Sequence, residues 1–191
     1  MPVPLLDEAN TNFDDLYALV EYVYEDTDEY GLGGVPIRPL GRSSADREIE
    51  HNVVFSEIQE TVVQGIRDAK YLICAAVAWF SNEAIFHELK AKKAAGLDIR
   101  VIVSDEESNA RLLPQLNEWF DVVIIPKYGR KEYNSMHDKF CIIDLDYVMH
   151  GSYNWTPTVN YNEETMVTAL DKEFVKKFAD EFMRMWMEHH L

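Results

Sequence analysis

Four polar side chains between positions 137 and 154 could act together on a phosphodiester. His137 and Lys139 lie two positions apart at the start of an apolar run, and Ser152 and Asn154 lie two apart after the next run. Residues two apart point the same way on a strand, because side chains alternate between its faces. If the two runs are adjacent strands, an imidazole, an ammonium, a hydroxyl and an amide meet at one edge of a sheet.

Each of these groups has a distinct task in phosphodiester cleavage. The ammonium neutralises phosphoryl oxygens, and the hydroxyl and amide donate directed hydrogen bonds to them. The imidazole can attack phosphorus and form a covalent intermediate that water later hydrolyses. The departing alkoxide needs a proton, which a second imidazole with a pKa near about 6.5 is suited to supply. The four residues therefore predict a phosphodiesterase.

The same residues belong to the longer pattern His-x-Lys-x4-Asp-x6-Gly-Ser-x-Asn, which runs from His137 through Asp144 and Gly151 to Asn154. This pattern resembles the catalytic motif of the phospholipase D superfamily, whose members split phosphodiesters through a histidine nucleophile and need no metal. The resemblance therefore implies that no metal ion or cofactor is required. The resemblance covers residues 52–188 and includes the segment Ala-Val-Ala-Trp79-Phe80-Ser81. It implies an α/β fold with a mixed central β-sheet flanked by helices.

In this family a glutamate follows the Gly-Ser-x-Asn element and is hydrogen-bonded to the catalytic histidine. Two adjacent residues, Glu163 and Glu164, could occupy that position. Glu163 fits better by its offset from Val167 in a strand predicted over 163–170, and Glu164 is the alternative. Such a carboxylate would fix the tautomer and orientation of the imidazole.

Residues around the motif are expected to support it in other ways. Asp144 falls on the face opposite the histidine by strand alternation, so we expect it to organise a turn, and Gly151 is a structural part of the motif. Lys127, Arg130 and Lys131 could bind substrate phosphates, although such residues more often form an ordinary solvated loop. Four aromatic residues could stack on bases or simply fill the rim of the site: Tyr128, Tyr133, Tyr153 and Trp155.

The motif occurs once, and one histidine cannot be nucleophile and protonated acid at the same moment. Superfamily members with two motifs fold both halves into one polypeptide, whereas single-motif members, such as small bacterial nucleases, form homodimers. The resemblance therefore implies one composite site at a homodimer interface. The remaining histidines sit in no comparable sequence setting: His51, His87, His150, His189 and His190.

Charge divides the chain into an acidic extension, residues 1–50, and a catalytic segment, residues 51–191. The extension holds 12 acidic and 3 basic side chains, and the segment holds 22 and 15, which together give the net charge of -16. This acidity argues against broad, salt-driven DNA binding but leaves room for a local positive site. A helix is predicted over 12–26, followed by a linker rich in glycine and proline over 31–41.

Regular elements are predicted from Asn52 onward. A capping box at Ser56 and Gln59 predicts the start of a helix, Ser81 can cap a second, and Asp171 a last one. A further helix is predicted around 112–119, where Pro114 could shorten or kink it. The apolar runs predict six strands, over 71–80, 99–103, 122–125, 139–143, 147–151 and 163–170.

Three functions remain open at this stage. The first is a homodimeric nuclease, favoured by compact size and by the absence of a lipid-binding element. The second is a lipid-acting phospholipase or transferase, and the third is a non-catalytic interaction module on the same fold. The two cysteines lie in apolar runs, and we see no signal peptide or span of 18 apolar residues, so we expect a cytoplasmic protein.

Overall fold

The computed structural model describes residues 13–14, 49–127, 136–157 and 163–190. The chain divides into two units, Met1–Glu48 and Ile49–Leu191. Residues 13 and 14 are helical, and the other residues of the helix predicted over 12–26 lie outside the described ones. The predicted boundary between an extension, residues 1–50, and a catalytic segment, residues 51–191, stays a prediction. Glu50, the last residue of that extension, is the first residue of β1 in the second unit.

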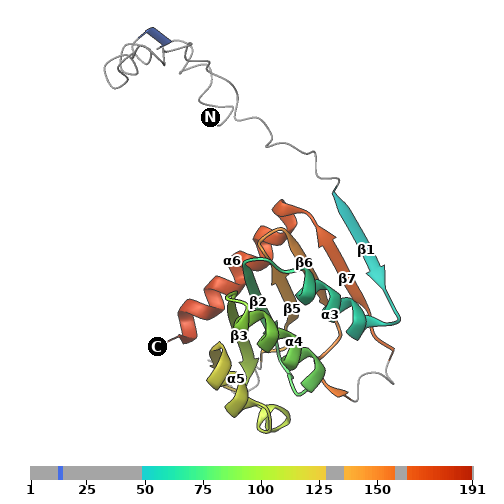
Figure 1. Cartoon of the computed structure of the whole chain (residues 1–191), viewed down its shortest axis with the longest axis vertical. Coiled ribbons are helices and arrows are strands. Elements are labelled where there is room, and N and C mark those ends of the chain that lie inside the picture. Colours follow the sequence, from blue (N-terminus) through green and yellow to red (C-terminus); the bar gives the residue numbers. More distant parts are fainter. Residues whose placement is uncertain (1–12, 15–48, 128–135, 158–162, 191) are drawn as a thin grey trace. The chain divides into compact units, whose positions relative to one another are not determined.

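Within the described residues, a mixed sheet of seven strands forms the centre of the second unit (Figure 1). Strands β2, β3 and β4 pair in parallel, and the other neighbours pair antiparallel. Across the sheet the order is β1 (Glu50–Val54), β7 (Met166–Leu170), β6 (Tyr147–Gly151), β5 (Lys139–Ile143), β2 (Leu72–Val77), β3 (Asp98–Ser104) and β4 (Asp121–Ile125).

Helices cover both faces of this sheet. The helices α3 (Ile58–Asp68), α4 (Glu83–Ala94) and α5 (Leu113–Trp119) pack on one face, where their apolar stripes meet one set of strand side chains. The long helix α6 (Lys172–His189) packs on the other face through Phe182, Met185 and their neighbours. The predicted α/β fold with a mixed central sheet between helices is confirmed.

The two motif strands have the predicted bounds and form a hairpin. Its turn contains Asp144 and Leu145, whose φ angles of 53° and 57° lie in the left-handed region. The Asp144 carboxylate accepts hydrogen bonds from the backbone N–H groups of Lys70, Tyr71 and Leu72 at 2.8, 2.8 and 2.9 Å. The carboxylate thereby ties the turn to the beginning of β2, which supports the structural role expected for Asp144.

One predicted helix cap is confirmed and two are wrong. Asp171 caps α6 by accepting from two backbone N–H groups. The capping box at Ser56 is wrong, because Glu57 is the N-cap of α3 and has no side-chain cap bond. The cap of α4 is Asn82 rather than Ser81, since the Asn82 side chain accepts from the next turn.

Strand β1 was not predicted, because it lacks the apolar alternation that marks a half-buried strand. Its residues are exposed except for a half-buried Val54, and it pairs with β7 along one side.

The two cysteines are buried on opposite faces of the sheet, Cys74 against the α6 layer and Cys141 against the other layer. Burial raises the pKa of both thiols, which keeps them protonated and unreactive.

Candidate active site

The predicted site residues gather at one edge of the sheet, where β2 and β6 end and where β5 and β7 begin (Figure 1). Lys139 at the start of β5 lies opposite Val77 at the end of β2. Gly151 at the end of β6 lies opposite Met166 at the start of β7. His137 precedes β5 by two residues, so its side chain also belongs to this edge.

Lys139 is the buried cation of the site. Its side chain is 9% exposed, and its Nζ donates to the backbone carbonyl of His137 at 2.7 Å. Burial lowers the pKa of Lys139, while the negative charges of Asp138 and Glu164 oppose that change. The ammonium therefore lies directly behind the histidine backbone, where it can attract a phosphate that approaches the imidazole.

The His137 side chain is exposed, as its predicted role as a nucleophile requires. Its ring lies 5.8 Å from the ring of Trp79, with an angle of 80° between the planes. Trp79 follows the end of β2 and is 38% exposed, whereas its neighbours Ala78 and Phe80 are fully buried. The imidazole and the indole thus stand side by side at the surface of the same sheet edge.

Ser152 is bound to the segment that leads into β7. Its Oγ donates to the Glu164 carboxylate and accepts from the Thr165 N–H at 3.1 Å, and its own N–H donates to the Thr165 carbonyl at 3.0 Å. Glu163, the preferred glutamate in the sequence, is exposed, and the carboxylate that reaches Ser152 and influences Lys139 is that of Glu164. The structure thus brings the alternative residue to the motif, next to the serine.

Asn154 is held in a buried segment that crosses to the end of β2. The Trp155 carbonyl accepts from the N–H groups of Ser81 and Asn82 at 2.8 and 2.9 Å. The Trp155 ring packs against the Phe80 ring, with 4.9 Å between the ring centroids. Asn154 is 8% exposed, and its Oδ1 has no hydrogen-bond partner among the described residues. A buried polar atom without a partner costs free energy, which is a common sign of a group kept ready for a ligand.

Gly151 is required by the close approach of two strands. A Cβ atom at this position would lie 2.0 Å from the Thr165 carbonyl oxygen, which is backbone and cannot rotate away. The glycine in the motif therefore lets β6 and β7 come together at the point where Ser152 and Glu164 meet.

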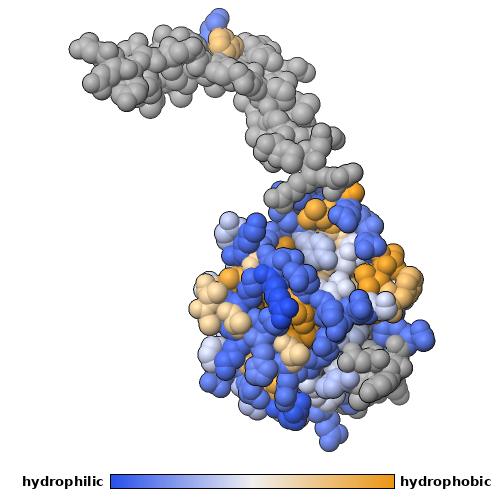
Figure 2. Space-filling model, turned by 45° about the vertical axis from the view of Figure 1, so that its right-hand side comes forward, coloured by the Kyte–Doolittle hydropathy of each residue, from blue (hydrophilic) through white to orange (hydrophobic). Residues whose placement is uncertain are grey.

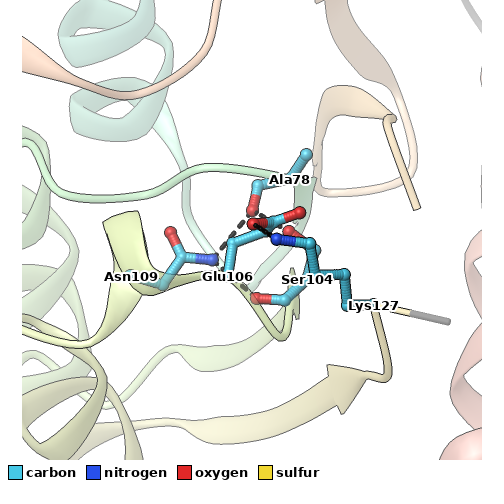
Figure 3. A network of polar contacts seen from close by, with 5 residues as sticks. All are labelled: Ala78, Ser104, Glu106, Asn109 and Lys127. Atoms are coloured by element: carbon cyan, nitrogen blue, oxygen red, sulfur yellow. Dashed lines mark hydrogen bonds and ion pairs between the residues drawn. The ribbon is translucent and has the colours of Figure 1, made fainter. Parts of the chain in front are cut away.

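A buried polar network fixes the end of β2 beside the motif (Figure 3). The Ala78 carbonyl accepts from Ser104 Oγ at 2.6 Å and from Asn109 Nδ2 at 2.8 Å. Asn109 Oδ1 accepts from the Phe80 N–H at 2.7 Å, so the one side chain holds the backbone on both sides of Trp79. Sequence reasoning missed this network, although Ser104 and Asn109 stand out as polar residues just after a buried parallel strand.

The basic residues predicted to bind substrate have different outcomes. Lys127 follows β4 at the same sheet edge, and its Nζ lies 2.9 Å from the Glu106 carboxylate (Figure 3). Arg130 and Lys131 lie outside the described residues, as do Tyr128 and Tyr133. Tyr153 and Trp155 are described, and they are 3% and 2% exposed, so neither presents a ring face to a ligand.

These residues together can bind and attack a phosphodiester. The edge offers an exposed imidazole, a buried ammonium, a hydroxyl and an amide, with a carboxylate beside them. Among the described residues no group of three or more His, Cys, Asp or Glu side chains could hold a metal ion. The independence from metal that the sequence predicts is left to experiment.

Comparison with known proteins shows the family. The family described as the PLD-like domain of cardiolipin synthase matches residues 62–186, which is more than half of the chain. The chain therefore belongs to the phospholipase D superfamily, as the motif predicted.

Curated relatives include mitochondrial cardiolipin hydrolases. The protein from Xenopus tropicalis is 38% identical over 111 residues, which are 58% of this chain and 52% of that one. The dog protein is 41% identical over 54 residues, which are 28% of this chain and 21% of that one. The chain thus spans about half or less of the length of these relatives.

Solved structures share the fold. NucT from Helicobacter pylori superposes with a TM-score of 0.66 at 22% identity, covering 73% of this chain and 97% of that one. Nuc from Salmonella typhimurium, a phospholipase D family member, has a TM-score of 0.65 at 20% identity, covering 74% and 97%. At these identities the likeness concerns the fold of the second unit.

Proposed function

We propose that this protein is a metal-independent nuclease that cleaves DNA or RNA through a covalent phosphohistidine on His137. The observation that carries the proposal is the meeting of His137, Lys139, Ser152 and Asn154 at one sheet edge, next to the Glu164 carboxylate. Lys139 and Asn154 are both polar and buried at that edge, which costs free energy of folding and is typical of groups that serve a ligand.

The reaction proceeds in two steps. His137 attacks phosphorus, so that a P–N bond forms, the P–O bond to the leaving group breaks, and the leaving oxygen takes up a proton from a second imidazole. That imidazole then removes a proton from water, the water oxygen attacks phosphorus, and the P–N bond breaks to release His137. Lys139 and Asn154 stabilise the charge on the phosphoryl oxygens in both steps.

The second imidazole comes from a second copy of the chain. All six histidines lie among the described residues, and no hydrogen bond or ring contact joins the other five to His137. His51 is hydrogen-bonded to Asp171, and His150 packs on Phe174 and Phe178. His87 lies on α4, His189 is the last residue of α6, and His190 is the C-cap of α6. A two-fold axis beside the site would bring His137 of two copies together around one phosphate.

Nucleic acid is preferred to lipid as the substrate because of the character of the surface. On the face in Figure 2, apolar side chains form small separate patches among hydrophilic ones, unlike a continuous membrane-binding surface. No helix among the described residues is long and apolar enough to span a bilayer. The net charge of -16 opposes broad binding of nucleic acid and of anionic lipids alike, so it does not distinguish the two substrates.

The lipid reaction is kept as a second candidate because the curated relatives carry the name cardiolipin hydrolase. Their names also place them in mitochondria, whereas the localisation that we predict for this chain is cytoplasmic. The third candidate, a module without catalysis, is disfavoured since the residues with chemistry at this edge are all present.

One assay distinguishes these candidates. Single-stranded DNA, duplex DNA, RNA, and phosphatidylcholine vesicles that contain cardiolipin are each incubated with the protein in EDTA. We expect cleavage of nucleic acid by the wild type, loss of that cleavage in His137→Ala, and normal cleavage by His87→Ala, whose histidine is exposed on α4. Lipid turnover alone would support the second candidate, and no turnover at all the third. A requirement for added metal would contradict the mechanism.

The shared site has its own test. Wild-type and His137→Ala chains are refolded together in equal amounts, so that about a quarter of the dimers contain two wild-type copies. If both His137 residues serve one phosphate, we expect about a quarter of the wild-type activity. About half of the activity would show that each chain works alone. A single-chain mass by light scattering in an active preparation would likewise contradict the dimer.

A further inference from the structure

Aromatic side chains at the site edge differ sharply in exposure. Tyr153 and Trp155, which follow the motif serine, are buried in the core. Burial also raises the pKa of Tyr153 to about 12, so its phenol stays neutral. Trp79 is 38% exposed and is the one aromatic ring that the described residues place in contact with His137. A part-exposed indole beside the predicted reacting group offers an apolar face that a flat ligand can cover.

The backbone around Trp79 is held unusually firmly for a surface residue. The buried Asn109 side chain binds the carbonyl of Ala78 (Figure 3). It also binds the N–H of Phe80, and the N–H of Ala78 donates to the Asp138 carbonyl at 2.9 Å. Phe80 is in turn locked against the Trp155 ring. The fold therefore presents the indole from a rigid support, so a ligand that uses it meets little loss of conformational entropy.

The contact with His137 leaves part of the indole free. The two ring planes make an angle of 80°, and a perpendicular contact occupies at most one face of either ring. Every nucleobase has a flat face, and stacking of a base on an aromatic side chain is tolerant of sequence. The Trp79 ring centroid lies 5.8 Å from that of His137. If the scissile phosphate is bound at His137, the indole is therefore near enough to contact the base of the adjacent nucleotide.

We propose that Trp79 is a substrate-binding residue on which a nucleobase adjacent to the scissile phosphate stacks, so that a single-stranded segment is held across His137. This inference rests on the proposed nuclease function and adds the part of the substrate that the site recognises besides phosphate. It also explains how an acidic protein can bind nucleic acid, since stacking supplies affinity without a broad basic surface.

The test uses oligonucleotides with and without bases. Wild type, Trp79→Ala, Trp79→Phe and Tyr71→Ala are compared by kcat/KM on a 12-nucleotide oligothymidylate or oligouridylate, whichever the wild type cuts faster. A 12-nucleotide strand of the same backbone without bases serves as the second substrate. Tyr71 is the matched control, since it is a 75% exposed aromatic residue at the opposite end of β2.

We expect Trp79→Ala to lower kcat/KM on the base-containing strand by about 5- to 150-fold, the range for loss of one stacked base. On the strand without bases, the same variant should match the wild type, and the wild type itself should cut that strand more slowly by a similar factor. Trp79→Phe should keep most of the activity, because it retains an aromatic face, and Tyr71→Ala should behave as wild type.

Other results would overturn the inference in recognisable ways. Equal losses of Trp79→Ala on both strands would make Trp79 a structural support of His137, and a shift to a monomer would make it part of the dimer interface. Loss of cardiolipin turnover alone would make it a lipid contact. If the wild type cuts neither strand, the nuclease function fails together with the inference, whereas cleavage that is indifferent to Trp79 removes the inference alone.

Discussion

The backbone N–H of Ala78 donates to the carbonyl oxygen of Asp138 at 2.9 Å, and this bond joins the end of β2 to the residue between His137 and Lys139. The Ala78 carbonyl, on the other side of the same residue, is bound by Ser104 and Asn109. Ala78 therefore connects a buried polar network to the segment that carries His137, and the stability of the network and the activity are expected to be coupled.

Asn109→Ala is expected to destabilise the protein by about 3 kcal/mol. The Asn109 side chain is fully buried and makes three hydrogen bonds, to the Ala78 and Ser104 carbonyls and from the Phe80 N–H. Its loss would leave the buried Phe80 N–H without its acceptor and would remove one donor from each carbonyl, which keep the Ser104 Oγ and the Glu106 N–H as donors. The free energy of unfolding in urea measures the loss. The matched control is Lys127→Ala, which breaks an exposed ion pair and should cost less than about 1 kcal/mol. Equal losses in the two variants would show that the network is not what stabilises this end of the sheet.

Gly151→Ala is expected to cost about 2–3 kcal/mol and to abolish most activity. Its added Cβ would meet the Thr165 carbonyl oxygen at 2.0 Å, so β6 and β7 must separate where Ser152 meets Glu164. Thermal unfolding and the nuclease assay measure both effects. Gly96→Ala serves as comparison, because its Cβ meets open space and only its φ of 96° is unfavourable, at about 1 kcal/mol with normal activity. Wild-type activity in Gly151→Ala would refute the proposed need for close strands.

Lys139→Met is expected to remove activity without removing stability. The variant keeps the length of the side chain but not the buried charge, so activity should fall at least about 100-fold while the free energy of unfolding is unchanged or higher. Because burial lowers the folded-state pKa of Lys139, the charged form is penalised on folding. Above pH 10.5, the ordinary pKa of a lysine, Lys139 is neutral in both the folded and the unfolded state, so the variant should gain no stability from removing the charge. As the pH falls from 10.5 towards the lowered pKa, the gain in the free energy of unfolding should grow.

Urea unfolding between pH 7 and 11 checks this dependence. A second lysine gives the contrast, since Lys92 Nζ donates to the Arg67 and Ala69 carbonyls at the end of α3. Lys92→Met should cost about 1 kcal/mol and leave activity intact. A loss of stability in Lys139→Met larger than that in Lys92→Met would mean that Lys139 is kept for the fold rather than for a phosphate.

Much of the fold could be predicted because its signals are local. The strands β5 and β6 follow directly from two apolar runs with a short acidic turn between them, and α6 from a carboxylate cap before an apolar stripe. Strand β1 could not be predicted in this way, since its residues face solvent and its only reason to be extended is the pairing with β7. Pairing partners distant in sequence leave no local pattern.

The site shows the same limit on a smaller scale. The sequence favours Glu163 because it lies four residues before Val167 and would share a face with it in a regular strand. However, β7 begins only at Met166, and residues before that point need not follow the alternation of a strand. Glu164 is therefore the carboxylate that reaches Ser152. The role of Asn109 also escaped prediction, because it depends on contacts with Ala78, 31 residues earlier in the chain.

Asp144 belongs to the sequence motif, but we expect it to serve stability and not catalysis. Its carboxylate accepts three backbone N–H groups at the start of β2, at the end of β5 opposite to Lys139. We expect Asp144→Ala to lower the free energy of unfolding by about 2–4 kcal/mol, and Asp144→Asn by about 1 kcal/mol, because the amide keeps one accepting oxygen. Activity per folded molecule, measured below the unfolding transition, should remain within about twofold of the wild type in both variants. If folded Asp144→Asn lost as much activity as His137→Ala, Asp144 would have to be counted among the catalytic residues. Asp144 and His137 share no contact, and a residue that only anchors the turn would not slow the chemical step.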